Sequence, residues 1–460
     1  MIPTFSDHGT AAGARPFRRG LWSTIALLGA VAFIAGLLTL TEGPKLRSMS
    51  LDEQSSIRTA GEITLRSDRA LATSPLASIR ITPEVSFSVT QKDLVLRLIL
   101  DEPLLAGTNY EVEVNGVEAA SLGASGNWSA SFRTPFEELL YLRAAGAETE
   151  LVRVVLDGSQ PEVIYRAPGI TSFAAVGAVF GVHRIWAGES ILELVEPNSG
   201  AVDRMALGPE IIVTSLARAS RGTSLIIEVD RKAEGRQEKG ILALVDTLGS
   251  REPEVVLGPG GNSLGVRKVA VSSESGNIVA WLRDSTLVVF EALTQTVIPL
   301  GSAAELWGFD SSGTSVIFVD SLGTIALNLS TGVETRIPAG QLDGSSVFHQ
   351  LTTLSPQGLS YQRVLLPGFV GEPDFSLVTE GDAEGRHRHL LGSLSTPESI
   401  GDLQLSPNGQ YLAVEINPVA TPLGYPALSD DVIRNTTELV ILDLANDAIL
   451  LSTPGFSFAW

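Results

Sequence analysis

Two kinds of hydrophobic pattern divide the chain. Near the N-terminus, 20 uncharged residues run from Leu21 to Leu40 (LWSTIALLGAVAFIAGLLTL), about the length that a helix needs to cross a bilayer. Beyond them, apolar and polar residues alternate in short runs, as in Leu94–Leu98 and Tyr110–Val114. Alternation with a period of two is typical of strands that bury one face. The pattern therefore predicts one apolar helix followed by an all-β chain.

The residues that flank the apolar segment indicate its orientation. Arg15, Arg18 and Arg19 precede it, and positive charge favours the cytoplasmic side of a membrane. A cleaved signal peptide would have a shorter apolar core and a small-residue cleavage site, which the exit sequence LTLTEGP lacks. We therefore expect residues 1–20 to be a cytoplasmic tail and 21–40 to be an uncleaved transmembrane signal anchor. The remaining chain would lie outside the cytoplasm, on a single-pass protein of the cell membrane.

Strand-like runs and turn signals alternate between residues 57 and 134, a length that suits a small antiparallel sandwich. The stretches Ile81–Pro83 (ITP), Pro103–Val112 (PLLAGTNYEV) and Phe132–Thr134 (FRT) resemble the bacterial Ig-like domains of S-layer and other surface proteins. The resemblance implies a spacer or adhesion module without catalytic residues. We expect a linker over residues 41–56 and an Ig-like β-sandwich over 57–134.

An internal repeat begins after this domain. An apolar run, a polar turn that ends in glycine and a second apolar run recur, with glycines at 177, 222, 276, 313, 358 and 409. Their mean spacing is about 46 residues, close to the ~40–45 of a four-stranded propeller blade. The turns Ser355–Gly358 (SPQG) and Ser406–Gly409 (SPNG) resemble those of TolB-like and WD-repeat propellers. The resemblance implies a β-propeller fold, which hosts many functions.

The two ends of the repeat region indicate how the propeller closes. The first unit shows three strands and no opening strand, whereas the chain finishes on the apolar run Gly455–Trp460. We expect residues 135–460 to form a propeller whose first blade is completed by residues 455–460. The length of the region favours seven blades, with six or eight left open.

Composition narrows the class of protein. The chain of 460 residues has no cysteine, 52 acidic and 32 basic residues, and a formal charge of −20. Absent cysteine excludes a disulfide scaffold and a thiol nucleophile, and the acidic balance disfavours nucleic acid as a partner. Stability without disulfides outside the cytoplasm must come from packing, which suggests a bacterial cell envelope.

Two motifs suggest chemistry, but neither has the context it needs. Gly261–Gly265 (GNSLG) matches the G-x-S-x-G nucleophile pattern, yet a strand and not a helix is expected to follow it. His387 and His389 lie two apart in an expected outermost, solvent-facing strand, where Arg386 and Arg388 would repel a cation. We therefore predict no catalytic residue, no cofactor and no metal site.

Long connections are the more informative feature. In a propeller blade, the connections between the second and third strands emerge on one face, together with those that join blades. Three of them are long, at 231–239, 366–374 and 418–436. Repeat proteins often carry insertions on their binding face, although long loops can also be neutral surface growth. The candidate binding residues in these loops are Arg236, Phe369, Asp374, Tyr425, Asp430 and Asp431.

Three functional hypotheses follow from these features. The leading one is a membrane-anchored extracytoplasmic binding or scaffold protein, whose propeller docks a protein or a cell-envelope polymer. The alternative is a propeller hydrolase or lyase that acts on envelope glycan or peptide with acidic residues around its channel. The third is a purely structural envelope component without a specific partner. The sequence favours binding over catalysis and does not identify the ligand.

Overall fold

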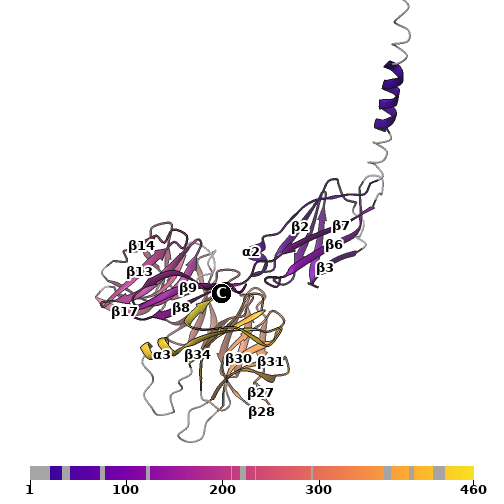
Figure 1. Cartoon of the computed structure of the whole chain (residues 1–460). Helices are drawn as coiled ribbons and strands as arrows, with labels where there is room; N and C mark the ends of the chain where they lie inside the picture. The colour runs from indigo at the N-terminus through magenta and orange to yellow at the C-terminus, as the bar shows by residue number, and fades with distance from the viewer. Residues whose placement is uncertain are drawn as a thin grey trace, which may run out of the picture. The chain divides into compact units, whose positions relative to one another are not determined.

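The computed structural model describes residues 21–33, 42–72, 78–120, 125–208, 210–217, 224–233, 235–291, 294–366, 375–392, 398–417 and 430–460. Nearly all regular structure in these ranges is β-strand (Figure 1). The chain divides into two compact units. Unit 1 holds residues 1–52, 61–101 and 109–133, and unit 2 holds residues 53–60, 102–108 and 134–460.

Unit 1 contains two antiparallel sheets, with the strand orders β1-β2-β5-β4 and β3-β6-β7. This is the strand order of an immunoglobulin constant-type sandwich. The alternation expected from the sequence is visible in β5, where Leu96, Leu98 and Leu100 are buried. The strands are β1 (Leu46–Ser50), β2 (Glu62–Ser67), β3 (Ser78–Thr82), β4 (Phe87–Lys92), β5 (Val95–Leu100), β6 (Asn109–Glu118) and β7 (Ser125–Arg133).

The expected linker over residues 41–56 contains regular structure. Strand β1 pairs with β2 at the edge of the four-stranded sheet, and the short helix α2 (Glu53–Ser56) follows it. Strand β1 has the sequence LRSMS, and none of its residues is fully buried. Because an edge strand of this kind buries little surface, it lacks the alternating pattern that marks a strand in the sequence.

Two segments next to unit 1 in the sequence belong to unit 2. Ile57 is 1% exposed and packs in a cluster with Tyr141 and Tyr411. The backbone N–H of Ala106 donates a hydrogen bond of 2.8 Å to Oε1 of Gln410. Residues 53–60 and 102–108 therefore contribute to the core of unit 2.

Unit 2 contains seven sheets in its described residues, numbered here in chain order, and all of their strand pairs are antiparallel except that of β27 with β32. Sheets 1 to 4 each have four strands. Their strands are β8 (Glu138–Ala145), β9 (Glu148–Val155), β10 (Glu162–Ala167) and β37 (Phe456–Ala459); β11 (Ile170–Val176), β12 (Val179–Trp186), β13 (Glu189–Val195) and β14 (Val202–Arg204); β15 (Ile211–Ala217), β16 (Ser224–Ala233), β17 (Arg236–Asp246) and β18 (Pro253–Val255); β19 (Val266–Val271), β20 (Ile278–Leu282), β21 (Thr286–Glu291) and β22 (Thr296–Ser302).

Sheets 5 and 7 also have four strands, whereas sheet 6 has six, in the order β28-β27-β32-β31-β30-β29. The helix α3 (Asp430–Thr436) precedes the third strand of sheet 7. The strands are β23 (Glu305–Phe309), β24 (Ser315–Asp320), β25 (Gly323–Asn328) and β26 (Glu334–Ile337); β27 (Gln341–Leu342), β28 (Ser345–Ser346), β29 (Phe348–Leu354), β30 (Ser360–Leu366), β31 (Phe375–Gly381) and β32 (Arg386–Leu391); β33 (Ser399–Leu405), β34 (Tyr411–Asn417), β35 (Glu438–Asp443) and β36 (Ala448–Pro454).

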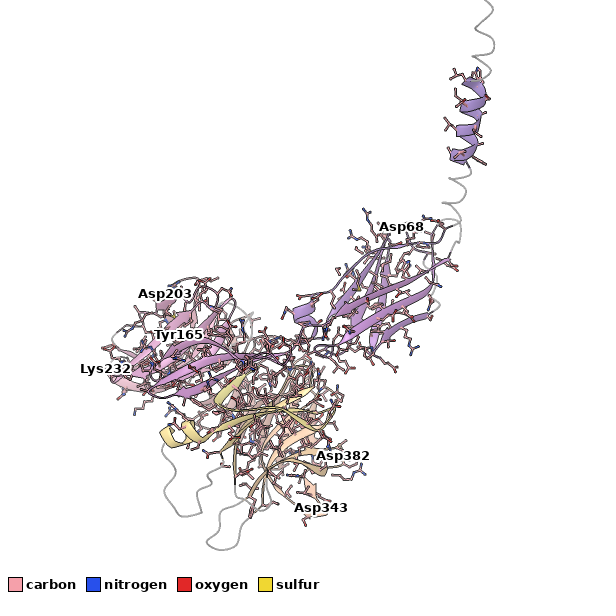
Figure 2. The ribbon with its side chains drawn as sticks, in the orientation of Figure 1. Asp68, Tyr165, Asp203, Lys232, Asp343 and Asp382 are labelled. Atoms are coloured by element: carbon pink, nitrogen blue, oxygen red, sulfur yellow. The ribbon has the colours of Figure 1, made fainter. Side chains whose placement is uncertain are left out.

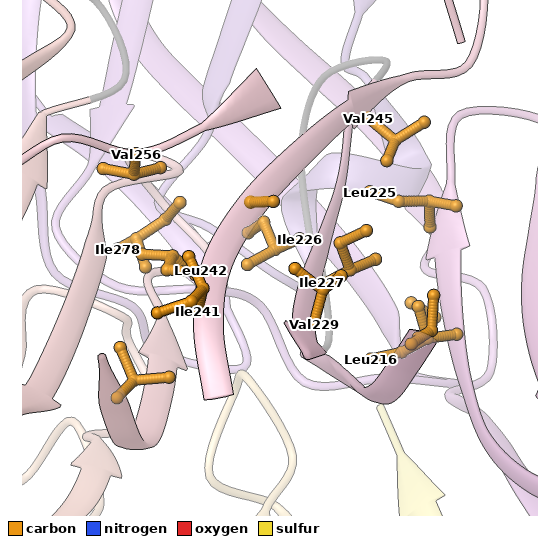
Figure 3. Packing of buried hydrophobic residues seen from close by; sticks show 14 of the residues in the cluster. Leu216, Leu225, Ile226, Ile227, Val229, Ile241, Leu242, Val245, Val256 and Ile278 are labelled. Carbon is orange, nitrogen blue, oxygen red and sulfur yellow. The ribbon is translucent and has the colours of Figure 1, made fainter. Parts of the chain in front are cut away.

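Hydrophobic clusters join each sheet to the next. In one of them Ile226 and Ile227 of sheet 3 pack together with Ile278 of sheet 4 (Figure 3). The series closes at both ends of the chain, because Leu439 and Ile441 of sheet 7 share a cluster with sheet 1. Strand β37, from the end of the chain, pairs antiparallel with β8. The seven sheets therefore form a closed ring with a β-propeller-like fold.

Side-chain hydrogen bonds define the turn between the first two strands of sheet 7. The Ser-Pro-Asn-Gly sequence joins β33 to β34, and Gly409 has a φ of 72°, which a residue with a Cβ atom rarely adopts. Oγ of Ser406 accepts the backbone N–H of Tyr411 at 2.9 Å, and Oδ1 of Asn408 accepts that of Gln410 at 3.1 Å. These side-chain acceptors satisfy backbone donors that the turn leaves outside the ladder.

The N-terminal apolar segment is described in part. Residues 21–33 form a helix whose side chains are all exposed, including Trp22 at 68% and Phe33 at 69%. Within the described ranges, no helix is both long enough and apolar enough to cross a membrane. Residues 34–40 of the expected anchor and the expected tail 1–20 lie outside the described residues. Membrane anchoring therefore stays a prediction.

Candidate binding face

Topology brings one class of connections to the same face of the ring. Apart from β27, which pairs parallel with β32 in sheet 6, neighbouring strands within each sheet are antiparallel. The connections from second to third strands therefore leave every sheet at the same end. The connections from one sheet to the next leave at this end as well. We call this end of unit 2 the connection face.

The three expected loops lie between second and third strands, but one of them is a strand pair. Residues 231–233 and 236–239 pair as the end of an extended β-hairpin, in which β16 and β17 run to Lys232 opposite Gln237 and Ala233 opposite Arg236. The expectation of a long loop there is wrong. The hairpin extends past the body of the sheet, and because both of its faces meet water its sequence shows no alternation.

Three of the six candidate binding residues lie within the described ranges, and three do not. Arg236 opens β17 at the tip of the hairpin and is exposed. Asp430 and Asp431 open helix α3, inside the connection from β34 to β35. Phe369, Asp374 and Tyr425 lie outside the described residues.

A hollow of about 600 Å³ lies at the base of the hairpin. A guanidinium–carboxylate pair joins Arg231 to Glu238 at 2.6 Å, and Oγ of Ser263 donates to Glu238 at 3.2 Å. Lys232 lies on the same hairpin (Figure 2). The residues that line the hollow are Glu210, Ile212, Asp230, Arg231, Lys232, Gly235 and Gln237. Charged groups therefore surround one exposed apolar side chain.

Further exposed apolar residues lie at the connection-face end of the neighbouring sheet. Ile185 and Trp186 end β12 with 52% and 50% exposure, and Ile212 in β15 has 54%. Oγ of Ser190, opposite Ile185 in the register, donates to the carbonyl oxygen of Val213 at 2.8 Å, so sheets 2 and 3 are joined beside these residues. Side chains alternate along a strand, so the consecutive residues Ile185 and Trp186 lie on opposite faces of sheet 2. Ile185, Trp186 and Ile212 share this end of the ring as separate exposed residues, and we call them the exposed apolar set. The sequence did not single it out, because isolated apolar residues at strand ends look like ordinary core positions.

Carboxylates outside this face are held by arginines. Glu193 in β13 accepts hydrogen bonds from Arg184 at 2.7 and 2.9 Å and from the hydroxyl of Tyr165 at 2.7 Å. Glu150 in β9 is bound in the same way by Arg143 and Arg166. Burial acts to raise the pKa of both glutamates, but these hydrogen bonds outweigh burial and lower it. Such carboxylates stay ionised and link neighbouring strands, which is a structural role.

The histidines have separate surroundings. His183 is fully buried between the hydroxyls of Thr171 and Ser190, and burial lowers its pKa to about 4. His387 is 9% exposed and bonded to Thr379 at 2.8 Å, whereas His389 is exposed. The expectation that β32 is an outermost, solvent-facing strand is wrong for His387, because β27 pairs with β32 on its outer side. Among the described residues, no three potential ligands are grouped to hold a metal.

Comparisons with known proteins give limited information. No protein-family model matches the chain, and no curated protein is similar to it in sequence. Among solved structures, the dihydro-heme d1 dehydrogenase NirN has 14% identity and a TM-score of 0.40, over 75% of this chain and 78% of that one. TolB from Acinetobacter baumannii has 13% identity and a TM-score of 0.35, over 83% and 81%.

A nidogen/laminin complex gives a similar result, with 13% identity and a TM-score of 0.35 over 70% of this chain and 97% of the matched chain. These TM-scores are too low to assign a fold or a function. The ring of seven sheets therefore rests on its own strand pairings.

Proposed function

We propose that this chain is an extracytoplasmic binding protein, anchored in a membrane, whose second unit is a seven-bladed propeller that docks a protein partner on the connection face. The observation that carries the proposal is the exposed apolar set at this face, of which Ile212 lines the charged hollow. Ile185, Trp186 and Ile212 each expose about half of their surface on this face.

The chemistry of this surface suits a protein ligand. Protein interfaces combine an apolar centre that includes aromatic residues with a polar rim, and tryptophan and arginine often dominate their binding energy. Here Ile212 lines the hollow together with Glu210, Arg231 and Lys232, and Trp186 is an exposed aromatic residue at the same end of the neighbouring sheet. An envelope polymer, the other ligand class suggested by the sequence, would need polar or charged contacts more than exposed isoleucines.

The proposed anchor and spacer have separate support. The helix over residues 21–33 carries no charged residue and exposes apolar side chains all round, which is unlike a surface helix of a water-soluble protein. Unit 1 has the strand order of an immunoglobulin constant-type sandwich. We propose that unit 1 is an Ig-like spacer between the membrane and the propeller.

The test has two steps. Crosslinking in intact cells and pull-down first identify the partner, and its affinity for purified variants is then measured. Trp186→Thr and Ile212→Thr each place a β-branched residue in the strand, which strands tolerate well. We expect Trp186→Thr to weaken binding about 30-fold, the effect of losing a central interface residue.

Leu248→Thr is the matched control. Leu248 is 80% exposed in the turn from β17 to β18, which leaves sheet 3 at the end opposite the connection face. Its substitution should leave affinity unchanged. If Leu248→Thr weakens binding as much as Trp186→Thr does, or if neither has an effect, docking on the connection face is wrong.

A further inference from the structure

A group of cations lies on the exposed face of the four-stranded sheet in unit 1. Arg66 in β2 is opposite Val95 in β5, and Val95 is opposite Lys92 in β4. Arg97, two residues along β5, shares the exposed face with Val95 because side chains alternate along a strand. Arg66, Lys92 and Arg97 are all exposed. We call these three residues the basic cluster.

The basic cluster surrounds a hollow and is incompletely neutralised. Glu62 pairs with Arg97 at 3.4 Å, but no carboxylate in the described part of the chain forms an ion pair with Arg66 or Lys92. Like charges on neighbouring strands repel one another, so an added anion would be bound favourably. The hollow measures about 650 Å³ and is lined by Arg66, Thr90, Gln91, Lys92, Asp93, Leu94, Val95 and Arg97.

The register places the basic cluster at the end of unit 1 where the chain enters from the apolar segment. Leu46, the first residue of β1, is opposite Ser67, and Ser48 is opposite Arg66. The backbone N–H of Lys45 donates to Oδ1 of Asp68 at 2.9 Å, next to this end of β2 (Figure 2). Only residues 41–45 separate Leu46 from the proposed anchor, and five residues span at most about 18 Å.

We propose that the basic cluster binds the phosphate groups of anionic phospholipid headgroups. The inference rests on the proposed anchor, which would hold this end of unit 1 close to the membrane surface. Phosphate is the anion present there, and arginine binds it through paired N–H donors. Residues 134–460 carry 39 acidic and 20 basic residues, so an anionic membrane repels most of the chain. The basic cluster would oppose that repulsion locally.

The absence of cysteine allows a direct measurement. The full chain with Leu94→Cys, in the β4–β5 turn between the cations, is labelled with a fluorophore and reconstituted into vesicles that carry a quencher on their headgroups. Neutral phosphatidylcholine vesicles are compared with vesicles that also contain phosphatidylglycerol. Each cation near an anionic surface favours the bound state about fivefold. We expect stronger quenching in the anionic vesicles, and its loss in Arg66→Glu/Lys92→Glu.

Arg80→Glu/Arg133→Glu is the matched control, because it changes the net charge equally with both substitutions on the three-stranded sheet. It should retain the extra quenching. Equal quenching in both kinds of vesicle, or equal loss in both double variants, would overturn the proposal. So would binding of soluble polyphosphate as tight as that of anionic vesicles, because the cluster would then be a site for soluble anions.

Vesicle flotation separates this proposal from that of the anchor. An anchored chain floats with neutral vesicles whether or not the basic cluster is intact. Flotation with anionic vesicles alone would mean that the proposed anchor is wrong and that the proposed binding by the basic cluster is correct. Flotation with neither kind would mean that both are wrong.

Discussion

At the scale of single residues, the ring contains buried glutamates that are stabilised in different ways. Glu193 and Glu150 are stable there because arginines bind them. Glu137, directly before β8, is different: it is fully buried, and burial raises its pKa to about 7, although Arg58 and the backbone N–H of Glu138 lower it. An unfolded glutamate ionises near pH 4.5, so the folded chain holds this proton over a pH range in which the unfolded chain releases it.

This proton links stability to pH. Between about pH 4.5 and 7 the folded state binds more protons than the unfolded state, so stability should fall as pH rises and level off above pH 7. Glu137→Gln should remove this fall and stabilise the protein at pH 8 by about 3 kcal/mol, because each pKa unit is worth about 1.4 kcal/mol. Urea denaturation at pH 5 and pH 8 measures both effects. Glu138→Gln, at the half-buried neighbour, is the control, and an unchanged pH dependence in Glu137→Gln would contradict this explanation.

The residue scale also shows what sequence can predict. Gly409 and its Ser-Pro-Asn-Gly turn were identifiable because the backbone conformation itself requires glycine. The buried position of His387 was not, because it depends on β27, a two-residue strand too short to show any period. The exposed apolar set could not be predicted for a similar reason. Exposure of Trp186 is set by where β12 ends relative to the sheet, and the identity of the residue does not indicate it.

At the scale of strands and sheets, β37 closes the ring and the hairpin of β16 and β17 extends from it. Strand β37 alternates between buried and partly exposed residues, and its two phenylalanines belong to different clusters. Phe458 packs with sheet 7, and Phe456 packs with sheet 2. A four-residue strand thereby joins three sheets. The apolar alternation of β37 predicts a strand from the sequence. The hairpin of β16 and β17 could not be predicted in this way, because the outer part of the hairpin is charged on both faces.

The closing strand should be essential for stability. Phe458 is fully buried, and loss of a buried phenylalanine side chain costs about 3–5 kcal/mol. We expect Phe458→Ala to lower the free energy of unfolding by that amount in urea denaturation. Ile449→Ala is the comparison, because Ile449 lies on the outer strand β36 with 57% exposure and should change stability by less than about 0.5 kcal/mol. Similar effects of the two substitutions would show that β37 does not close the ring.

At the scale of the whole molecule, the sequence predicts the order of the apolar helix, the first domain and the ring more accurately than it predicts the residues at which they begin and end. Strand β1 extends the sandwich into the expected linker, and segments 53–60 and 102–108 belong to unit 2. The edge strand β1 buries too little surface to show a pattern, and the two segments contain residues whose burial depends on distant partners, as for Ile57 beside Tyr411. The proposed function rests on the way the ring gathers connections on one face, a consequence of topology that no single motif contains.

Docking of a protein on the connection face is the central claim, and photo-crosslinking in intact cells tests it most directly. A photoreactive amino acid is placed at position 186 in one variant and at position 248, on the opposite end of the sheets, in another. The account predicts one dominant crosslinked protein from position 186 and none from position 248. The same crosslinks from both positions, or a partner captured only from position 248, would contradict it.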